Sequence, residues 1–142
     1  MPVLTSTQVR ERFAAARVAH LATADATAHP HLAPVVFAVD GDTVVLAVDH
    51  KPKRTTQLKR LANIAANPSV CLIVDHYEED WDRLWWARAD GRAHVLPPPD
   101  HCAEAARWAG LLTAKYEQYA DRQPDGPVVV ISVARWSGWQ AW

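Results

Sequence analysis

Short apolar runs of strand length, separated by polar and turn-forming residues, make up most of this sequence. Runs of this length that are rich in β-branched residues favour β-strands. Because the connections between them are short, neighbouring strands should pair antiparallel, and a twisted sheet of this size tends to close into a small barrel. Six strands are expected, over residues 18–23, 31–39, 43–48, 69–75, 83–95 and 128–136.

Turn-forming residues mark the ends and irregularities of these strands. The segment Asp40-Gly41-Asp42 predicts a hairpin turn between the second and third strands. Pro34 lacks the N–H group that a ladder needs, so we expect an edge strand or a bulge at that position. Gly91 predicts a bulge in the long fifth strand. Residues 137–142, SGWQAW, are expected to form a Trp-rich tail after the last strand.

Helical spacing of apolar residues predicts three helices. Thr5 and Gln8 have the spacing of a capping box, which should start a helix that ends near Ala16. A second helix should follow the basic residues 51–54 and end at Asn67-Pro68. Asp100 should cap a third helix of about 18 residues. The apolar face of the third helix is expected to hold Ala105, Trp108, Leu112, Tyr116 and Tyr119.

The composition is that of a single globular domain, which we expect to span residues 1–142. A net charge of −1 argues against a general nucleic-acid binder. No apolar run approaches the roughly 20 residues that cross a bilayer, and the first residues lack a secretory core, so we expect a cytoplasmic protein without a membrane. Cys71 and Cys102 lack partners at metal-ligand spacing and the histidines are scattered, so no metal site is expected.

A basic loop stands between an apolar strand and the start of the second predicted helix. Lys51, Lys53 and Arg54 directly precede the hydroxyl of Thr55. The free N–H groups and the positive end of the helix dipole point toward such a loop, which makes it a plausible phosphate site. The alternative is that these cations only solvate a surface turn.

The order and spacing of three long segments resemble a known family. These are VAHLATADATAHPHLAPVVFAVDGD, LAVDHKPKRTTQLKRLANIAANPSVCLIVD and DWDRLWWARADGRAHVL, which cover most of residues 18–96. They resemble the pyridoxamine 5'-phosphate oxidase-like proteins, and in particular the branch of deazaflavin-dependent oxidoreductases that use coenzyme F-420. One departure is that Ala28-His29 stands before Pro30 where the family usually has a glycine, which puts the turn geometry in question.

This resemblance implies a mainly β fold with helices, a six-stranded antiparallel split β-barrel of the FMN-binding type flanked by about three helices. It also implies a homodimer with cofactor sites at the interface, a phosphate clamp at the basic loop, and a ring along the second and third strands. Trp85 and Trp86 should face opposite sides of their strand, one in the core and one at the interface or over the cofactor. The implied cofactor-binding residues are His31, Pro34, Val35, Val36, Val48, Asp49, Lys51, Lys53, Arg54, Thr55, Trp86 and Trp139.

The activity implied is hydride transfer from reduced F-420 to an unsaturated or quinone-like small molecule. The chemistry belongs to the cofactor, so no catalytic residue is expected, and a proton would come from solvent or from a group such as His31, Tyr77 or His94. The third strand, TVVLAV, carries no cation, which favours the deazaflavin over FMN. The alternatives are an FMN-dependent oxidase or reductase of the same fold, or a non-catalytic deazaflavin carrier.

Overall fold

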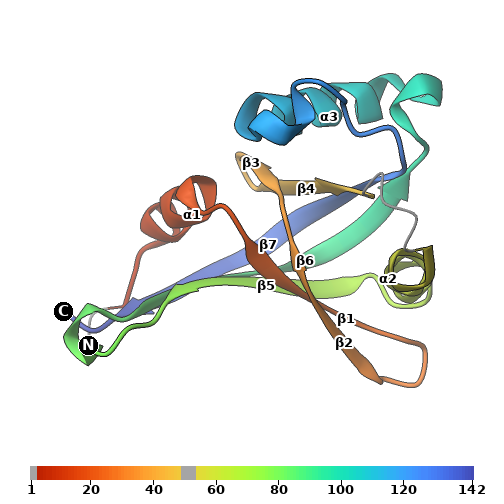
Figure 1. Cartoon of the computed structure of the whole chain (residues 1–142). Helices are drawn as coiled ribbons and strands as arrows, with labels where there is room; N and C mark the ends of the chain where they lie inside the picture. Colours follow the sequence, from red (N-terminus) through yellow and green to blue (C-terminus); the bar gives the residue numbers. More distant parts are fainter. Residues whose placement is uncertain (1–2, 49–53) are drawn as a thin grey trace.

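A computed structural model describes residues 3–48 and 54–142 of the chain. Its strands form one antiparallel sheet in the order β2-β1-β5-β6-β7-β4-β3 (Figure 1). The predicted class, mainly β with three α-helices, is therefore confirmed. The strands are β1 Ala19–Ala24, β2 Pro30–Val35, β3 Ala38–Asp40, β4 Thr43–Ala47, β5 Ser69–His76, β6 Trp85–Leu96 and β7 Val128–Gln140.

The second predicted strand is in fact two strands, so the expected count of six becomes seven. Its first half, β2, pairs with β1 at one edge of the sheet, and its second half, β3, pairs with β4 at the other edge. The hydrogen-bonded ladder therefore does not close, and the chain itself connects the two edges at Val36-Phe37. Pro34 lies on β2, an edge strand of the sheet, which confirms the position predicted for it.

The long hairpin of β6 and β7 contains the predicted irregularity at Gly91. The register shifts between Asp90 and Gly91, but the extra residue, Ala134, lies on β7. A Cβ on Gly91 would stand 2.3 Å from the carbonyl oxygen of Ser132, so the close approach requires glycine. The expected tail is wrong: β7 continues to Gln140, because residues 136–140 pair with the first residues of β6.

Three helices accompany the sheet, and two begin or end as predicted. Helix α1, Ser6–Ala15, has the capping box: the Gln8 N–H donates to Thr5 Oγ1 at 3.2 Å and the Thr5 N–H donates to Gln8 Oε1 at 2.8 Å. Helix α2, Arg54–Ala66, ends directly before Asn67-Pro68. Helix α3, Ala103–Lys115, begins later than predicted, because Asp100 lies in a short 3-10 turn that follows Pro97 and Pro98.

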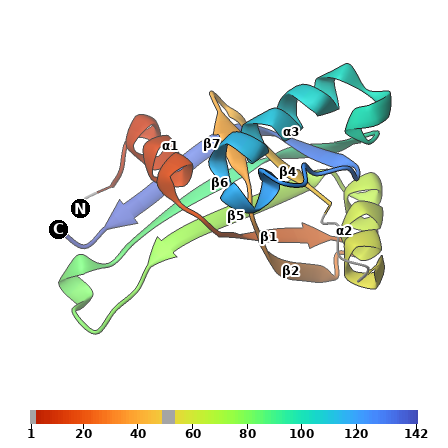
Figure 2. The ribbon, with the colours of Figure 1, turned by 45° about the horizontal axis from the view of Figure 1, so that its top comes forward.

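The helices α1 and α3 cover one face of the sheet, and α2 lies at its end (Figures 1 and 2). One buried cluster beneath α1 contains Phe13 and Phe37, whose ring centroids are 5.7 Å apart. A second cluster lies beneath α3 and contains the residues of the predicted apolar face, from Ala105 to Tyr119. The predicted helix of about 18 residues is too long, however: α3 ends at Lys115, Tyr116 caps it, and Tyr119 lies in a separate 3-10 turn. Among the described residues, no helix is long and apolar enough to span a membrane.

The turn between β1 and β2 resolves the question raised by Ala28. Ala28 adopts a φ of 65°, the left-handed conformation that glycine takes more easily. The Asp25 carboxylate compensates by accepting hydrogen bonds from the N–H of Thr27 at 2.9 Å, its hydroxyl at 2.8 Å, and the N–H of His29 at 3.0 Å. The turn is therefore built around an ionised carboxylate instead of a glycine.

These contacts predict an acid-dependent loss of stability. The His29 N–H and the Thr27 groups lower the pKa of Asp25 from 3.8 to about 2. A lowered folded-state pKa stabilises the fold above the unfolded-state value, and this contribution disappears as the pH falls through about 2. In urea titrations, Asp25→Asn should be less stable than the wild type by a constant amount near neutral pH, and the difference should shrink below about pH 4. A difference that is independent of pH would contradict this account.

Candidate functional site

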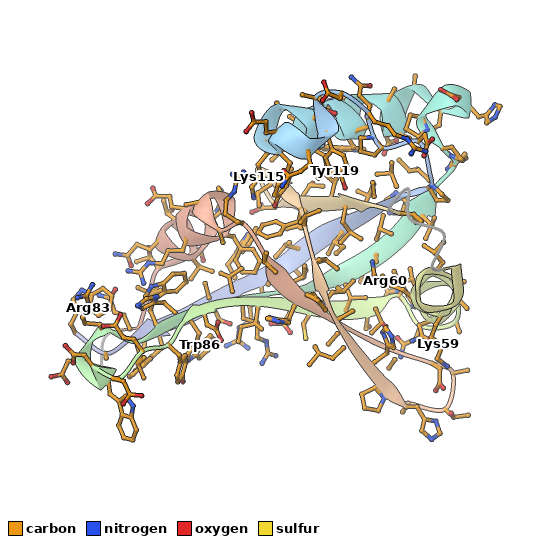
Figure 3. The ribbon with its side chains drawn as sticks, in the orientation of Figure 1. Lys59, Arg60, Arg83, Trp86, Lys115 and Tyr119 are labelled. Atoms are coloured by element: carbon orange, nitrogen blue, oxygen red, sulfur yellow. The ribbon has the colours of Figure 1, made fainter. Side chains whose placement is uncertain are left out.

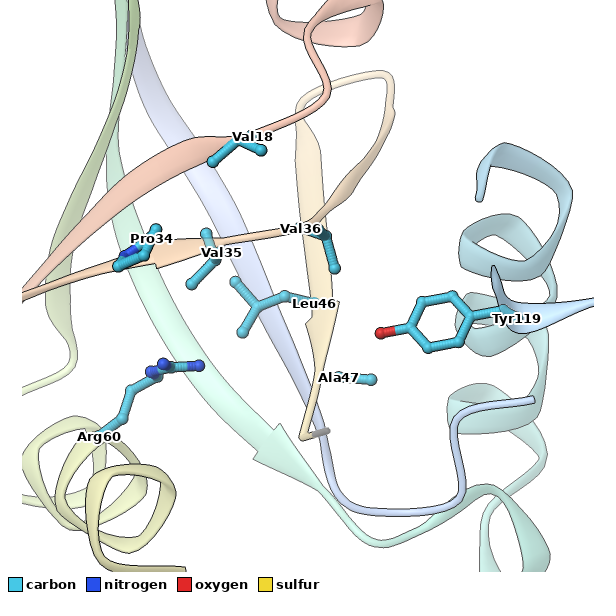
Figure 4. A pocket seen from close by; sticks show the side chains of 8 residues that line it. All are labelled: Val18, Pro34, Val35, Val36, Leu46, Ala47, Arg60 and Tyr119. Carbon is cyan, nitrogen blue, oxygen red and sulfur yellow. The ribbon is translucent and has the colours of Figure 1, made fainter. Parts of the chain in front are cut away.

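A cavity of about 300 Å³ lies between β2, β4 and α2. Apolar side chains make most of its wall, and Arg60 is the one charged residue among the described residues that line it (Figure 4). The wall is formed by Val18, Pro34, Val35, Val36, Leu46, Ala47, Arg60 and Tyr119.

Arg60 reaches into this cavity from α2. Its guanidinium points across the cavity toward Val35 and Leu46 (Figure 4). The side chain is about half-buried, and Nε has no hydrogen-bond partner within the part of the chain that the structure describes. Burial lowers the pKa of Arg60 from its ordinary value, because a charged group is less stable away from water. The cavity therefore contains a positive charge that its described lining does not compensate.

A buried polar contact fixes the helix that carries Arg60. Asn63 Nδ2 donates to Thr23 Oγ1 of β1 at 3.1 Å, and both residues are almost fully buried. Ile64, one turn after Arg60, enters the core cluster. These contacts hold α2 against the sheet, so the direction of Arg60 is set by packing on both sides of it.

The structure brings together part of the predicted site. Pro34, Val35 and Val36, which were expected to support a ring, line the cavity. On the neighbouring strand the lining residues are Leu46 and Ala47, whereas the expected Val48 follows β4 and donates its N–H to the Pro127 carbonyl at 3.0 Å. The phosphate clamp cannot be placed: Asp49, Lys51 and Lys53 lie outside the described residues, as do the side chains of Arg54 and Thr55 in the first turn of α2.

Three other predicted residues lie away from the cavity. His31 is on β2 opposite Thr23 and does not line it. Trp86 lines a separate hollow of about 400 Å³ with Ile73 and Tyr77, on the face of the sheet that points away from α1 and α3 (Figure 3). Trp139 pairs with Trp86 across the β6–β7 ladder. Trp85 packs against the core, so the two adjacent tryptophans do face opposite sides.

Sequence reasoning missed Arg60 and Tyr119. Arg60 stands four residues before Ile64, so a helical projection places it beside the apolar face, where a cation is unusual. This spacing could have identified Arg60 as a candidate from the sequence. Tyr119 was expected only as part of the buried face of the third helix, and its approach to β2 and β4 depends on the tertiary fold.

These features define a small split-barrel-like fold with a cavity of about 300 Å³ where β2 and β4 approach each other. The family model described as pyridoxamine 5'-phosphate oxidase matches residues 5–140, and the chain belongs to this family. The resemblance noted for residues 18–96 is thereby confirmed at the level of the family. No curated protein matches the sequence.

Solved structures with the same fold have diverse names. An FAD-binding protein from Mesorhizobium loti is 20% identical with a TM-score of 0.70, covering 96% of this chain and 94% of its own. The FAD-binding protein of Mycobacterium smegmatis is 18% identical with a TM-score of 0.64, covering 98% and 96%. HutZ, a heme storage protein from Vibrio cholerae, is 14% identical with a TM-score of 0.67, covering 91% and 87%. At such identities these likenesses establish the fold alone.

Proposed function

We propose that this protein is an oxidoreductase that binds reduced coenzyme F-420 and transfers hydride to an unsaturated or quinone-like small molecule. The observation that carries this proposal is the apolar cavity against Pro34, Val35 and Val36, with Arg60 aimed into it from α2. The cavity lies beside the helix that the basic loop precedes, so ring and phosphate would occupy adjacent parts of one site.

The residues present fit such a cofactor. The apolar side chains of β2 and β4 can contact the face of a planar ring, and a cavity of about 300 Å³ accommodates the ring portion of a larger ligand. The unpartnered Nε of Arg60 is a buried donor that a polar atom of the ring would satisfy. When bound, the cofactor supplies the hydride chemistry.

The chain's own residues then bind, orient and exclude water. Lys51, Lys53, Arg54 and Thr55 would hold the phosphate with charge-assisted hydrogen bonds. Pro34, Val35 and Val36 would support the ring, and Leu46 on β4 would keep water from its edge. No side chain serves as a nucleophile in this scheme, and the proton comes from solvent or from a group such as His31.

We also propose a homodimer that covers the open face of the sheet. Pro34, His20 and Ile73 lie in one row across β2, β1 and β5, so the cavity wall and the hollow beside Trp86 share this face. Leu32 on the same face of β2 is 67% exposed. No described helix covers this face (Figure 1). A second copy placed there would bury the apolar residues and reach the mouth of the cavity.

A flavin enzyme is the second candidate. The FAD-binding names of two proteins with this fold favour FMN or FAD over the deazaflavin. A carrier that binds the cofactor without turnover is a third, and the heme storage protein HutZ shows that the fold also carries names unrelated to redox enzymes.

Binding and turnover separate these candidates. The purified protein should bind F-420 at micromolar concentration, followed by fluorescence of the deazaflavin, and reduced F-420 should then be consumed in a screen of quinones and unsaturated acceptors. Tight binding of FMN or FAD with a flavin absorption band would favour the second candidate. Binding without turnover of any acceptor would favour the carrier. If no F-420, FMN or FAD binds, the proposal fails.

Removing two cations of the basic loop should weaken cofactor binding. The double variant Lys53→Gln/Arg54→Gln should lose more than about 2 kcal/mol of F-420 binding free energy, because both contacts are charge-assisted. The control Arg10→Gln/Arg107→Gln removes the same charge from side chains of α1 and α3 that pair with Asp42 and Asp40. It should bind as the wild type does. Equal affinity for both doubles and the wild type would place the phosphate elsewhere.

A further inference from the structure

Arg60 presents a charge that the cofactor tail, as placed above, does not neutralise. It stands six residues after Arg54, which is about 9 Å along the helix axis. Its guanidinium points across the cavity, toward Val35 and Leu46 (Figure 4). A phosphate held at the start of α2 would therefore leave Arg60 facing the ring.

The described residues of the cavity wall provide no negative charge that would neutralise Arg60. Its described lining contains no carboxylate, and Asp25, the carboxylate nearest in sequence to this region of β1 and β2, is held by the turn and by Lys59 at 4.0 Å. The remaining wall is apolar apart from the Tyr119 ring and its hydroxyl. A half-buried cation in such surroundings interacts more strongly with an anion than it would in water.

We infer that Arg60 makes this cavity selective for an anionic ring. This inference rests on the proposed function. The protein would bind the cofactor with a negatively charged ring more tightly than the cofactor with a neutral ring. Coenzyme F-420 has an acidic hydroxyl on its ring, so both forms exist in solution. The guanidinium would favour the ionised hydroxyl and lower its pKa in the complex.

The prediction is a shift in the titration of bound F-420, read from the absorbance of the ring. In the wild type, the ring hydroxyl of bound F-420 should titrate at least one pKa unit below its value in free solution, which equals a tenfold preference for the anion. Arg60→Gln should return the hydroxyl toward its free value and weaken F-420 binding at least tenfold above that pKa. Arg60→Lys should retain part of the shift in pKa, because lysine keeps the positive charge but lacks the planar set of N–H donors of a guanidinium.

Lys59 offers a matched control on the neighbouring position. Lys59→Gln removes the same unit charge from the same helix, but Lys59 pairs with Asp25 and does not line the cavity. Lys59→Gln should leave the titration of the ring hydroxyl unchanged. If Lys59→Gln and Arg60→Gln shifted that titration equally, the effect would come from the overall charge of α2, and the specific role of Arg60 would be overturned. A wild-type complex whose ring titrates as in free solution would overturn the inference even if Arg60→Gln failed to fold.

The outcomes also separate this inference from the proposed function. If F-420 binds and Arg60→Gln titrates as the wild type does, the inference fails while the cofactor site stands. If only FMN binds, the F-420 proposal fails, and the inference moves to the reduced flavin ring, which is acidic. Arg60→Gln should then lower the midpoint potential by about 30 mV for each tenfold loss of preference for the reduced ring. An unchanged potential would overturn it there as well.

Discussion

Replacing Tyr116 by Phe is expected to lower the free energy of unfolding by about 2 kcal/mol. The Tyr116 hydroxyl accepts a hydrogen bond from the Phe37 N–H at 3.1 Å and lies 2.9 Å from the carbonyl oxygens of Phe37 and Arg17, to one of which it donates. Tyr116 is 5% exposed, so the backbone groups left behind would have no access to water. Burial raises the pKa of Tyr116, which keeps the hydroxyl protonated as a donor.

The same substitution should weaken cofactor binding. Phe37 follows Val36 at the junction where the chain passes from β2, which pairs with β1, to β3, which pairs with β4, and Val36 lines the cavity. Packing in the core holds the Phe37 ring, but within the described part of the chain the hydrogen bonds of its N–H and carbonyl both go to the Tyr116 hydroxyl. Urea unfolding measures the change in the free energy of unfolding. Titration of the folded variant with F-420 measures the change in affinity that follows from a displaced cavity wall. Tyr77→Phe, at an exposed hydroxyl, should stay within about 0.5 kcal/mol of the wild type. If Tyr116→Phe were as stable as that control, the hydrogen bonds of the Tyr116 hydroxyl would not contribute to stability.

Features decided by neighbouring residues were predictable from the sequence. The Thr5–Gln8 capping box, the hairpin turn at Gly41 and the end of α2 at Asn67-Pro68 each depend on a few adjacent positions. Gly91 could be assigned to an irregularity because a glycine inside a long strand often marks a bulge or a close backbone approach. The extra residue on β7, Ala134, could not be predicted, because the pairing register of two strands is decided by the tertiary fold.

Features decided by distant residues were not predictable. The apolar run 31–39 continues without a break in sequence, and the group that divides it into β2 and β3 is Tyr116, 79 positions later. The end of β7 was misjudged because Trp136, Trp139 and Gln140 acquire a ladder partner only when β6 lies beside them. The start of α3 was misjudged by two residues, with the cap at Cys102 instead of Asp100, because the consecutive prolines lead into a 3-10 turn first.

The same division applies to the candidate site. Pro34, Val35 and Val36 were predicted as cofactor-binding residues from a resemblance in the local order of residues, and the structure places all three on the wall of one cavity. Arg60 belongs to the site only because Asn63 and Ile64 press α2 against β1, which no local pattern states. Trp86 and Trp139 lie on the open face, so whether they reach a cofactor depends on a second copy of the chain.

Introducing a carboxylate at Ile73 should abolish the proposed dimer. Ile73 is partly exposed, lies in the row that joins Pro34 to the open face, and borders the hollow beside Trp86. In a two-fold assembly the substitution Ile73→Asp would place two unpaired carboxylates in one interface. The dimer dissociation constant should rise at least 100-fold, which corresponds to about 3 kcal/mol. Sedimentation equilibrium over a range of protein concentrations measures the change.

Ala106→Asp is the matched control, because it adds the same charge to an exposed position in the first turn of α3, where a carboxylate is favourable. It should remain dimeric. Since Ile73 points out of the core, Ile73→Asp should keep its fold, and its F-420 affinity then reports on the site alone. If the cavity is completed by the partner, the monomeric variant should bind F-420 more weakly although Arg60 and Pro34 are intact. A monomer that binds with wild-type affinity would show that each chain holds its cofactor by itself, and a variant that stays dimeric would place the interface on another face.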